Sequence, residues 1–239
     1  MPLRIGFDMD GTLADFRRAF RDVEVRLFGP GPGVLPDQPE REEAAQSSAQ
    51  DGADAGLAEA VDTSTPPLDL RRRRREIWKE IQATADFWRT LRPLDAGAVA
   101  RIHRLMLEHR WEVFFITQRP YSDGDTVQRQ TQQWLVEQGF DLPSVLVLGG
   151  SRGAAAAALR LDYHIDDSLQ NCLDVMSDAA ARPILIVSPD DDREAAGARQ
   201  LGIATAGSIG DSLDILERAT LARTSPGVFA RLASLVGWR

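Results

Sequence analysis

Residues 7–16 read FDMDGTLADF, and they place two aspartates one residue apart at the end of an apolar run. Apolar residues alternate with others over 3–8, which predicts a β-strand. Side chains two positions apart on a strand lie on the same face, so Asp8 and Asp10 are expected to project together. Two close carboxylates repel each other unless a cation or a shared proton relieves them. The stretch therefore indicates a metal site or acid–base chemistry at the end of a strand.

Apolar strands alternate with amphipathic helices along the later part of the chain. Helices are expected over 95–109, 123–139, 152–160, 168–180 and near 192–200, and strands over 111–117, 144–148, 163–165, 183–187 and 202–206. This alternation is typical of a parallel sheet covered by helices on both faces. We therefore predict an α/β fold with a doubly wound parallel sheet, whose ligands bind outside the carboxyl ends of the strands.

A smaller helical unit is expected after the first strand. Helical spacing of apolar residues predicts helices over 14–28 and 68–83. Residues 29–67 between them have few large apolar side chains, so this insert cannot bury enough surface to offset its ordering entropy and is expected to be mostly disordered. The expected domains are a core over 1–16 and 90–221, a helical cap over 17–89 that contains the insert, and a C-terminal helical tail over 222–239.

Composition limits the partners of the protein. The chain has 239 residues and a net charge of −8, which argues against general affinity for nucleic acid or an anionic membrane. The arginine run at 71–75 fits a solvated helix face better than a nucleic-acid site. No apolar run approaches the roughly 18 residues of a membrane span, and the start of the chain resembles neither a signal nor a transit peptide. A cytoplasmic protein without a membrane or a stable nucleic-acid partner is expected.

Two further features bear on compartment and assembly. The single cysteine, Cys172, excludes an internal disulfide framework and fits a reducing compartment. The C-terminal segment 226–239 fits either an amphipathic helix packed on the core or a contact with a second subunit in a homodimer. The sequence leaves both alternatives open.

Polar side chains collect where the predicted strands end. Taken singly, each has a structural explanation as a turn residue or a helix cap. Their joint position at successive strand ends of one sheet is explained better by a ligand. These residues are Asp8, Asp10, Gly11 and Thr12 after the first strand, Thr117, Gln118 and Arg119 after the second, Ser151, Arg152 and Gly153 after the third, and Asp166 and Asp167 after the fourth.

These residue types together suit a phosphate group bound with a metal ion. Magnesium takes oxygen ligands, usually one or two carboxylates together with water and a phosphate oxygen. Asp8 with Asp166 or Asp167 would supply those carboxylates, and the small anionic substrate would need a local positive charge.

The same residues suggest how a phosphoryl group would react. The Asp8 carboxylate would act as the nucleophile and form an aspartyl-phosphate intermediate. Asp10 would protonate the leaving oxygen and later take a proton from water. Thr117 would hold phosphate oxygens, and Arg152 would offset negative charge in the transition state.

The motifs resemble those of the haloacid dehalogenase (HAD) superfamily of phosphatases. DMDGTL at 8–13 matches the first motif in full, FFITQR at 114–119 resembles the second, and HIDDS at 164–168 resembles the fourth, the acidic pair. The resemblance implies a HAD-like core with a small helical cap after the first motif, Mg²⁺ as cofactor, and a main-chain oxygen of Asp10 on the metal.

Two longer segments, 86–105 and 151–175, are similar to the 5'(3')-deoxyribonucleotidase branch of that superfamily. In that branch aromatic cap residues help to hold the nucleoside, which makes Phe16 and Phe87 or Trp88 candidates for contact with a base. An aromatic ring at helical spacing also fits a core position. The expected substrate-binding residues are Gly11, Thr12, Phe16, Trp88, Gln118 and Arg119.

One position departs from the superfamily pattern. The third motif normally carries lysine, whereas this chain has Ser-Arg-Gly at 151–153. Arginine keeps the positive charge, but its planar fork is larger and aims its donors differently from an ammonium group. The leading hypothesis is a Mg²⁺-dependent phosphatase acting on a nucleoside monophosphate. The alternatives are a weak or inactive protein that binds phosphate or nucleotide, and a phosphatase acting on nucleic-acid ends or phosphoproteins.

Overall fold

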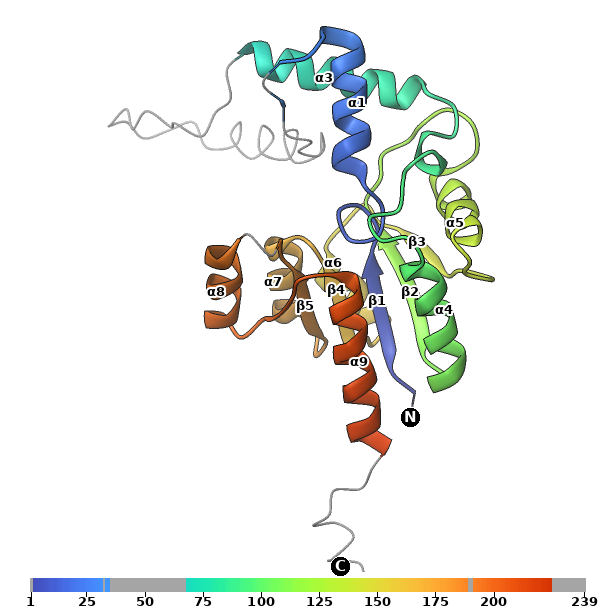
Figure 1. Ribbon diagram of the computed structural model, residues 1–239, viewed down its shortest axis with the longest axis vertical. Helices are drawn as coiled ribbons and strands as arrows, with labels where there is room; N and C mark the ends of the chain where they lie inside the picture. Colours follow the sequence, from blue (N-terminus) through green and yellow to red (C-terminus); the bar gives the residue numbers. More distant parts are fainter. Residues whose placement is uncertain (1, 32, 35–67, 189–190, 225–239) are drawn as a thin grey trace, which may run out of the picture.

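The computed structural model describes residues 2–31, 33–34, 68–188 and 191–224 (Figure 1). Most of the expected insert over 29–67 and all of the segment 226–239 lie outside these residues. The expectations about them are therefore still predictions.

A parallel sheet forms the centre of the described structure. Its six strands are arranged in the order β3-β2-β1-β4-β5-β6. β1 lies in the middle, with Phe7 beside Phe115 on one neighbour and Ile165 on the other. The predicted α/β fold with a doubly wound parallel sheet is confirmed. The strands are β1 (Arg4–Asp8), β2 (Glu112–Thr117), β3 (Val145–Val147), β4 (Tyr163–Asp166), β5 (Arg182–Ile186) and β6 (Ala204–Ala206).

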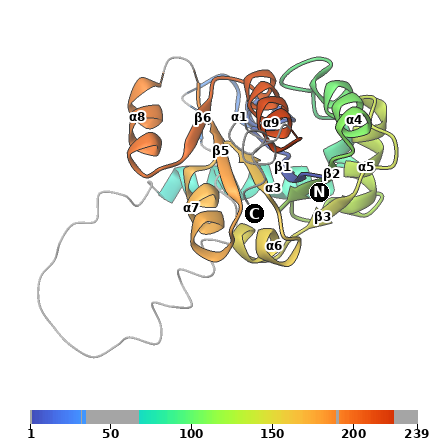
Figure 2. The ribbon, with the colours of Figure 1, turned by 90° about the horizontal axis from the view of Figure 1, so that it is seen from below.

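Helices cover both faces of the sheet (Figure 2). One face carries α4 (Ala98–His109), α5 (Val127–Glu137) and α9 (Ile209–Thr224), and the other carries α6 (Arg152–Ala158), α7 (Leu169–Asp178) and α8 (Asp192–Gln200). Ile184 and Leu185, adjacent on β5, belong to different apolar clusters, as the alternation of side chains on a strand requires. The two faces are therefore separate cores divided by the sheet.

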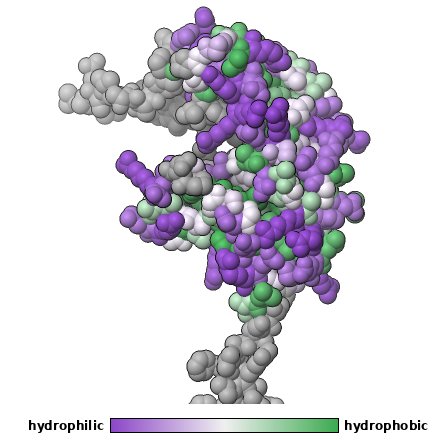
Figure 3. All heavy atoms as spheres, viewed as in Figure 1, coloured by the Kyte–Doolittle hydropathy of each residue, from purple (hydrophilic) through white to green (hydrophobic). Residues whose placement is uncertain are grey.

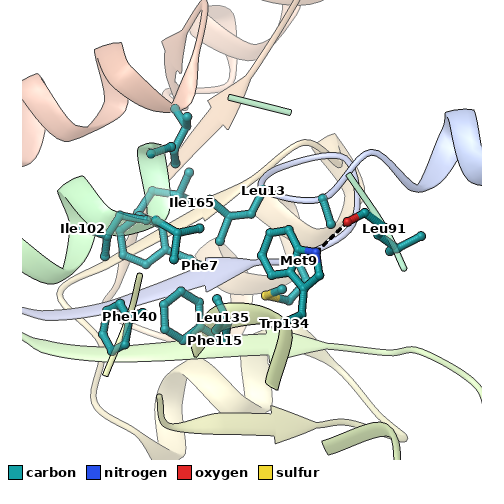
Figure 4. Packing of buried hydrophobic residues seen from close by; sticks show 14 of the residues in the cluster. Phe7, Met9, Leu13, Leu91, Ile102, Phe115, Trp134, Leu135, Phe140 and Ile165 are labelled. Carbon is teal, nitrogen blue, oxygen red and sulfur yellow. Dashed lines mark hydrogen bonds between the residues drawn. The ribbon is translucent and has the colours of Figure 1, made fainter. Parts of the chain in front are cut away.

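The larger core holds the first strand in place. Phe7, Phe115 and Phe140 pack together beneath the helices, as Figure 4 shows. Trp134 of α5 is fully buried there, and its indole N–H donates to the Leu91 carbonyl oxygen at 2.7 Å. A buried indole N–H without a partner would be costly, so this bond satisfies the polar atom of an otherwise apolar cluster.

A pair of cap helices, α1 (Phe16–Phe28) and α3 (Leu68–Ala83), lies beyond the carboxyl ends of the strands (Figure 1). The Asp15 side chain accepts from the Arg18 N–H and so caps α1 at the end of the loop that follows β1. The short 3₁₀-helix η1 (Phe87–Arg89) leads the chain back to the core. Neighbouring rings of the aromatic cluster that joins cap and core have centroids 5.2–6.5 Å apart; its members are Phe16, Phe20, Trp78, Phe87 and Trp88.

Hydrophilic residues dominate the surface in the view of Figure 3, over the cap and the core alike. Apolar residues occur there in small separate groups. Among the described helices, none combines the length and the apolar character that crossing a membrane requires.

Candidate functional site

The carboxyl edge of the sheet brings the predicted site residues together. Asp8 ends β1, Thr117 ends β2, and Asp166 ends β4, while Arg152 begins the helix that follows β3. Carboxylate oxygens of Asp8, Asp166 and Asp167 lie within 4.8 Å of one another. The ends of two strands thus form one acidic cluster, and a basic side chain from a third part of the chain lies beside it.

Burial and mutual repulsion act on these three carboxyl groups. Burial raises the pKa of Asp8 well above its usual value, although the Arg152 guanidinium opposes the shift. Burial and the charge of Asp166 raise the pKa of Asp167 to about 7. Burial also acts against ionisation of Asp166, but its contacts with His164 and Arg152 lower its pKa overall. A divalent cation among these oxygens would relieve the repulsion, so the donor set fits Mg²⁺.

Hydrogen bonds fix the orientation of Asp166. A ring nitrogen of His164 lies 2.9 Å from its Oδ2, and the Ser168 N–H donates to its Oδ1 at 2.9 Å. The Asn171 amide nitrogen donates to both oxygens at 3.1 Å. His164 precedes the aspartate by two residues on the same face of β4, so the spacing of the strand was the signal for this contact, which the sequence analysis missed.

Arg152 lies against two carboxylates of the acidic cluster, Asp8 and Asp166. Ser151 caps α6 by accepting from the Gly153 N–H, which places Arg152 in the first turn of the helix. Its guanidinium donates to Asp8 Oδ1, and its Nε lies 3.6 Å from Asp166 Oδ2. The residue is only 4% exposed, and its Nε and Nη1 have no hydrogen-bond partner among the described residues. These two buried donors would suit the oxygens of an anion.

Asp10 is held by an arginine from the neighbouring loop. Arg119 donates from Nε to Asp10 Oδ2 at 2.8 Å and from Nη2 to Oδ1 at 2.7 Å. Thr117 Oγ1 lies 3.4 Å from the same carboxylate. The Arg119 side chain is fully buried. Its guanidinium therefore has Asp10 as a partner in place of solvent. The expected substrate-binding role of Arg119 remains a prediction.

The loop after β1 requires glycine at position 11. Gly11 has φ of 89°, and a Cβ placed there would lie 2.0 Å from Asp167 Oδ2. The main-chain N–H groups of Leu13 and Ala14 both donate to the Met9 carbonyl oxygen and close the loop. Thr12 is buried, and its hydroxyl has no partner within the described part of the chain. The close approach of Gly11 lets the first loop lie directly against the acidic pair.

The remaining expected substrate residues lie at the margins. The Gln118 side-chain amide donates to the Gly150 carbonyl oxygen at 2.6 Å and so ties two site loops together. Phe16 and Trp88 are 8% and 1% exposed, and their rings pack against each other in the aromatic cluster at 5.4 Å. Both rings thus have core contacts in this structure, and their contact with a substrate remains a prediction.

A cavity of about 440 Å³ opens beside Asp167. It lies between the first loop and the segments that follow β5 and β6, and its polar lining includes Arg17, Ser188, Glu194 and Ser208. The predicted strand-end residues all come from the first four strands. Ligands of such sheets bind at the carboxyl ends of the strands. The residues that follow β5 and β6 could therefore have been predicted to line the site as well.

We expect Gly11→Ala to disturb the acidic pair beyond its backbone strain. The substitution forces a side chain into a positive φ, which costs about 1–3 kcal/mol, and it drives Asp167 from its place. Gly97→Ala is the matched control, because Gly97 has φ of 92° and open space around its Cβ position. Urea unfolding with and without Mg²⁺ measures the free energy of unfolding of both variants and of the wild type. Equal losses of stability, with the same gain from Mg²⁺, would contradict the expected clash.

Comparisons with known proteins support the fold. No model of a known protein family matches the chain, and no curated protein sequence matches it significantly. Among solved structures, a putative β-phosphoglucomutase from Thermotoga maritima has a TM-score of 0.50 at 16% identity, over 90% of this chain and 99% of that one. A haloacid dehalogenase-like hydrolase from Streptococcus pneumoniae has a TM-score of 0.52 at 12% identity, over 90% and 98%.

An L-2-haloacid dehalogenase has a TM-score of 0.52 at 16% identity, over 91% of this chain and all (100%) of its own. At these identities the likeness shows the fold alone, which is HAD-like, as the motifs at 8–13 and 164–168 predict. The closer resemblance to the deoxyribonucleotidase branch remains a prediction.

Proposed function

We propose that the protein is a Mg²⁺-dependent phosphomonoester hydrolase that acts through an aspartyl-phosphate intermediate, with a nucleoside monophosphate as substrate. The observation that carries the proposal is the approach of three carboxylates, Asp8, Asp166 and Asp167, within 4.8 Å at the carboxyl edge of the sheet. Like charges held this closely and buried are costly without a cation. A cation beside a potential nucleophile is the arrangement that phosphoryl transfer requires.

The chain's own residues perform the two chemical steps. An oxygen of Asp8 attacks the phosphorus, the bond to the leaving oxygen breaks, and that oxygen takes both electrons of the bond and a proton from Asp10. Water then attacks the phosphorus of the aspartyl phosphate and gives one proton to Asp10, and the bond between phosphorus and the Asp8 oxygen breaks with both electrons returning to the Asp8 carboxylate. Phosphate leaves, and both aspartates return to their starting states.

The phosphoryl oxygens need positive or donating groups around them. The Thr117 hydroxyl supplies one such group, and Arg152 supplies two donors, Nε and Nη1, that have no hydrogen-bond partner among the described residues. Asp8, Asp166 and Asp167, with a main-chain oxygen of Asp10, would hold Mg²⁺. When bound, that ion neutralises negative charge on the phosphoryl oxygens.

The ion pair between Arg152 and Asp8 supports a second candidate function, a protein that binds phosphate or nucleotide with little or no turnover. Arg152 stands where the third motif normally has lysine, and it donates directly to the proposed nucleophile. A carboxylate engaged in a charge-assisted hydrogen bond is a weaker nucleophile. If the protein is a phosphatase, the phosphoryl group of the substrate would replace Asp8 as the partner of Arg152.

A substrate panel with and without Mg²⁺ separates these functions. We expect Mg²⁺-dependent release of phosphate from 4-nitrophenyl phosphate and from deoxynucleoside monophosphates, and loss of that release with EDTA. The panel includes a sugar phosphate, a 5'-phosphorylated oligonucleotide, a phosphopeptide and 2-chloropropionate, since an L-2-haloacid dehalogenase shares the fold. Halide release without metal would favour a dehalogenase. Phosphate binding without turnover of any ester would favour the binding protein.

A further inference from the structure

We propose that Arg119 is a positioning residue that holds the Asp10 side chain in place for its proton transfers, first to the leaving oxygen and then from water. The inference rests on the proposed function. Its first support is geometric. Arg119 Nε donates to Asp10 Oδ2 at 2.8 Å, and Nη2 donates to Oδ1 at 2.7 Å. A two-point contact of this kind fixes the plane of a carboxylate as well as its position.

Arg119 is itself held on its remaining sides. Its Nη1 donates to Thr131 Oγ1 at 2.9 Å, and that hydroxyl donates to the Val127 carbonyl oxygen within α5. The guanidinium carbon lies 5.0 Å from the centre of the Trp88 ring, a distance at which the ring face attracts a cation. Contacts with α5 and with the buried Trp88 ring thus fix Arg119, and Arg119 in turn fixes Asp10.

Trp88 is fixed in turn by the loop that follows β2 and by α5. Its indole N–H donates to the Pro120 carbonyl oxygen at 3.0 Å, and its main-chain N–H donates to Gln130 Oε1 at 3.1 Å. Gln130 is fully buried and donates to the Asp125 carbonyl oxygen at 2.6 Å. Trp88 therefore has one polar partner on its ring and a second on its main chain, and it provides a fixed surface for the guanidinium.

Other contacts would hold Asp10 less firmly. Its side chain is 20% exposed, and the hydroxyl of Thr117 reaches it at 3.4 Å, which is at the outer limit for a hydrogen bond between oxygens. Without Arg119, the carboxylate would be free to rotate toward solvent. Errors of about 1 Å in the placement of a reacting group can cost about 100-fold in rate.

The leaving group reveals whether a residue acts through this proton transfer. When the phosphorus–oxygen bond breaks, an alkyl oxygen leaves as an alcohol only if Asp10 supplies a proton. A 4-nitrophenolate ion is stable without one. Since kcat/KM reports the steps up to loss of the leaving group, a defect in proton transfer lowers it for alkyl phosphates and spares 4-nitrophenyl phosphate.

The test compares kcat/KM for 4-nitrophenyl phosphate with that for the alkyl phosphate of the panel that is turned over fastest. For Arg119→Met we expect about a 100-fold loss on the alkyl ester and a loss at least about tenfold smaller on the aryl ester. Arg119→Lys keeps the charge without the fork and should restore only part of the alkyl rate. Thr131→Val should give a smaller loss with the same dependence on the leaving group.

Arg101→Met is the matched control, because Arg101 pairs with Asp214 and Glu217 away from the site. Its variant should lose activity on neither ester. Unfolding of each variant is measured first, and if Arg119→Met does not fold, the lysine and Thr131 variants carry the comparison. If Arg119→Met lost the same factor of kcat/KM on both esters, or lost none, the inference about Arg119 would be wrong while the proposed function would stand. If the wild-type chain hydrolyses neither ester, the proposed function fails and the inference fails with it.

Discussion

Asp8→Asn is expected to abolish phosphate release, with a loss of about 10⁴-fold or more. An amide is a poor nucleophile toward phosphorus, and it also removes one of the three carboxylates that would hold Mg²⁺. The variant should remain folded, because the Asp166 carboxylate still lies 3.6 Å from Arg152 and keeps that buried charge paired. Steady-state phosphate release at saturating Mg²⁺ is the measurement.

Asp162→Asn is the control for this substitution. Asp162 lies at the opposite end of β4, where it accepts from the Arg4 main-chain N–H and from Arg223. Loss of its charge should leave phosphate release unchanged while lowering stability slightly. If Asp8→Asn retained turnover within about tenfold of the wild type, the covalent mechanism would be wrong.

Arg152→Ala is expected to have the second large effect, and it acts on stability as well as on turnover. Removal of one partner from a buried ion pair typically costs about 3–5 kcal/mol, and here Asp8 and Asp166 both lose their cation. Loss of a charged donor to the phosphoryl oxygens should lower kcat by about 10²–10³-fold. Mg²⁺ should recover part of the stability, because it replaces the missing positive charge.

Urea unfolding and phosphate release, each measured with and without Mg²⁺, test the role of Arg152. Arg152→Lys is the matched variant, since it keeps a charge at the position where the HAD superfamily normally has lysine. An Arg152→Ala protein with wild-type turnover would remove Arg152 from the mechanism. Turnover that is higher in the lysine variant than in the wild type would support the view that the arginine restrains Asp8.

Sequence patterns predicted the fold well because each strand carries its own apolar signal. The boundaries were less certain, since caps and loops depend on distant partners. The helix expected over 123–139 begins at Val127, because Thr126 caps it and the preceding loop bonds elsewhere, as in the contact of the Asp125 N–H with Asp86. The helix α9 was not predicted separately, although Ile209, Leu213 and Leu216 recur at helical spacing on its buried side.

The candidate site was only partly predictable for a related reason. A strand end can be read from local pattern, which is why Asp8, Thr117 and Asp166 could be named as neighbours. The partner of a long side chain cannot be read in this way. The substrate-binding role expected for Arg119 remains a prediction, and local pattern gave no sign of its contact with Asp10, which is distant in sequence and brought near by the pairing of β1 with β2. Burial of Trp88 beneath it depends equally on tertiary packing.

The position of β1 in the middle of the sheet has a consequence for synthesis of the chain. β1 leaves the ribosome before the other described strands, yet both strands that pair with it, β2 and β4, come much later in the sequence. At about 5–20 residues per second, the segment from Asp8 to Glu112 takes on the order of 5–20 s to emerge. During that time the apolar side of β1 has no sheet to join, so the nascent chain is expected to depend on chaperone protection until β4 completes the centre of the sheet.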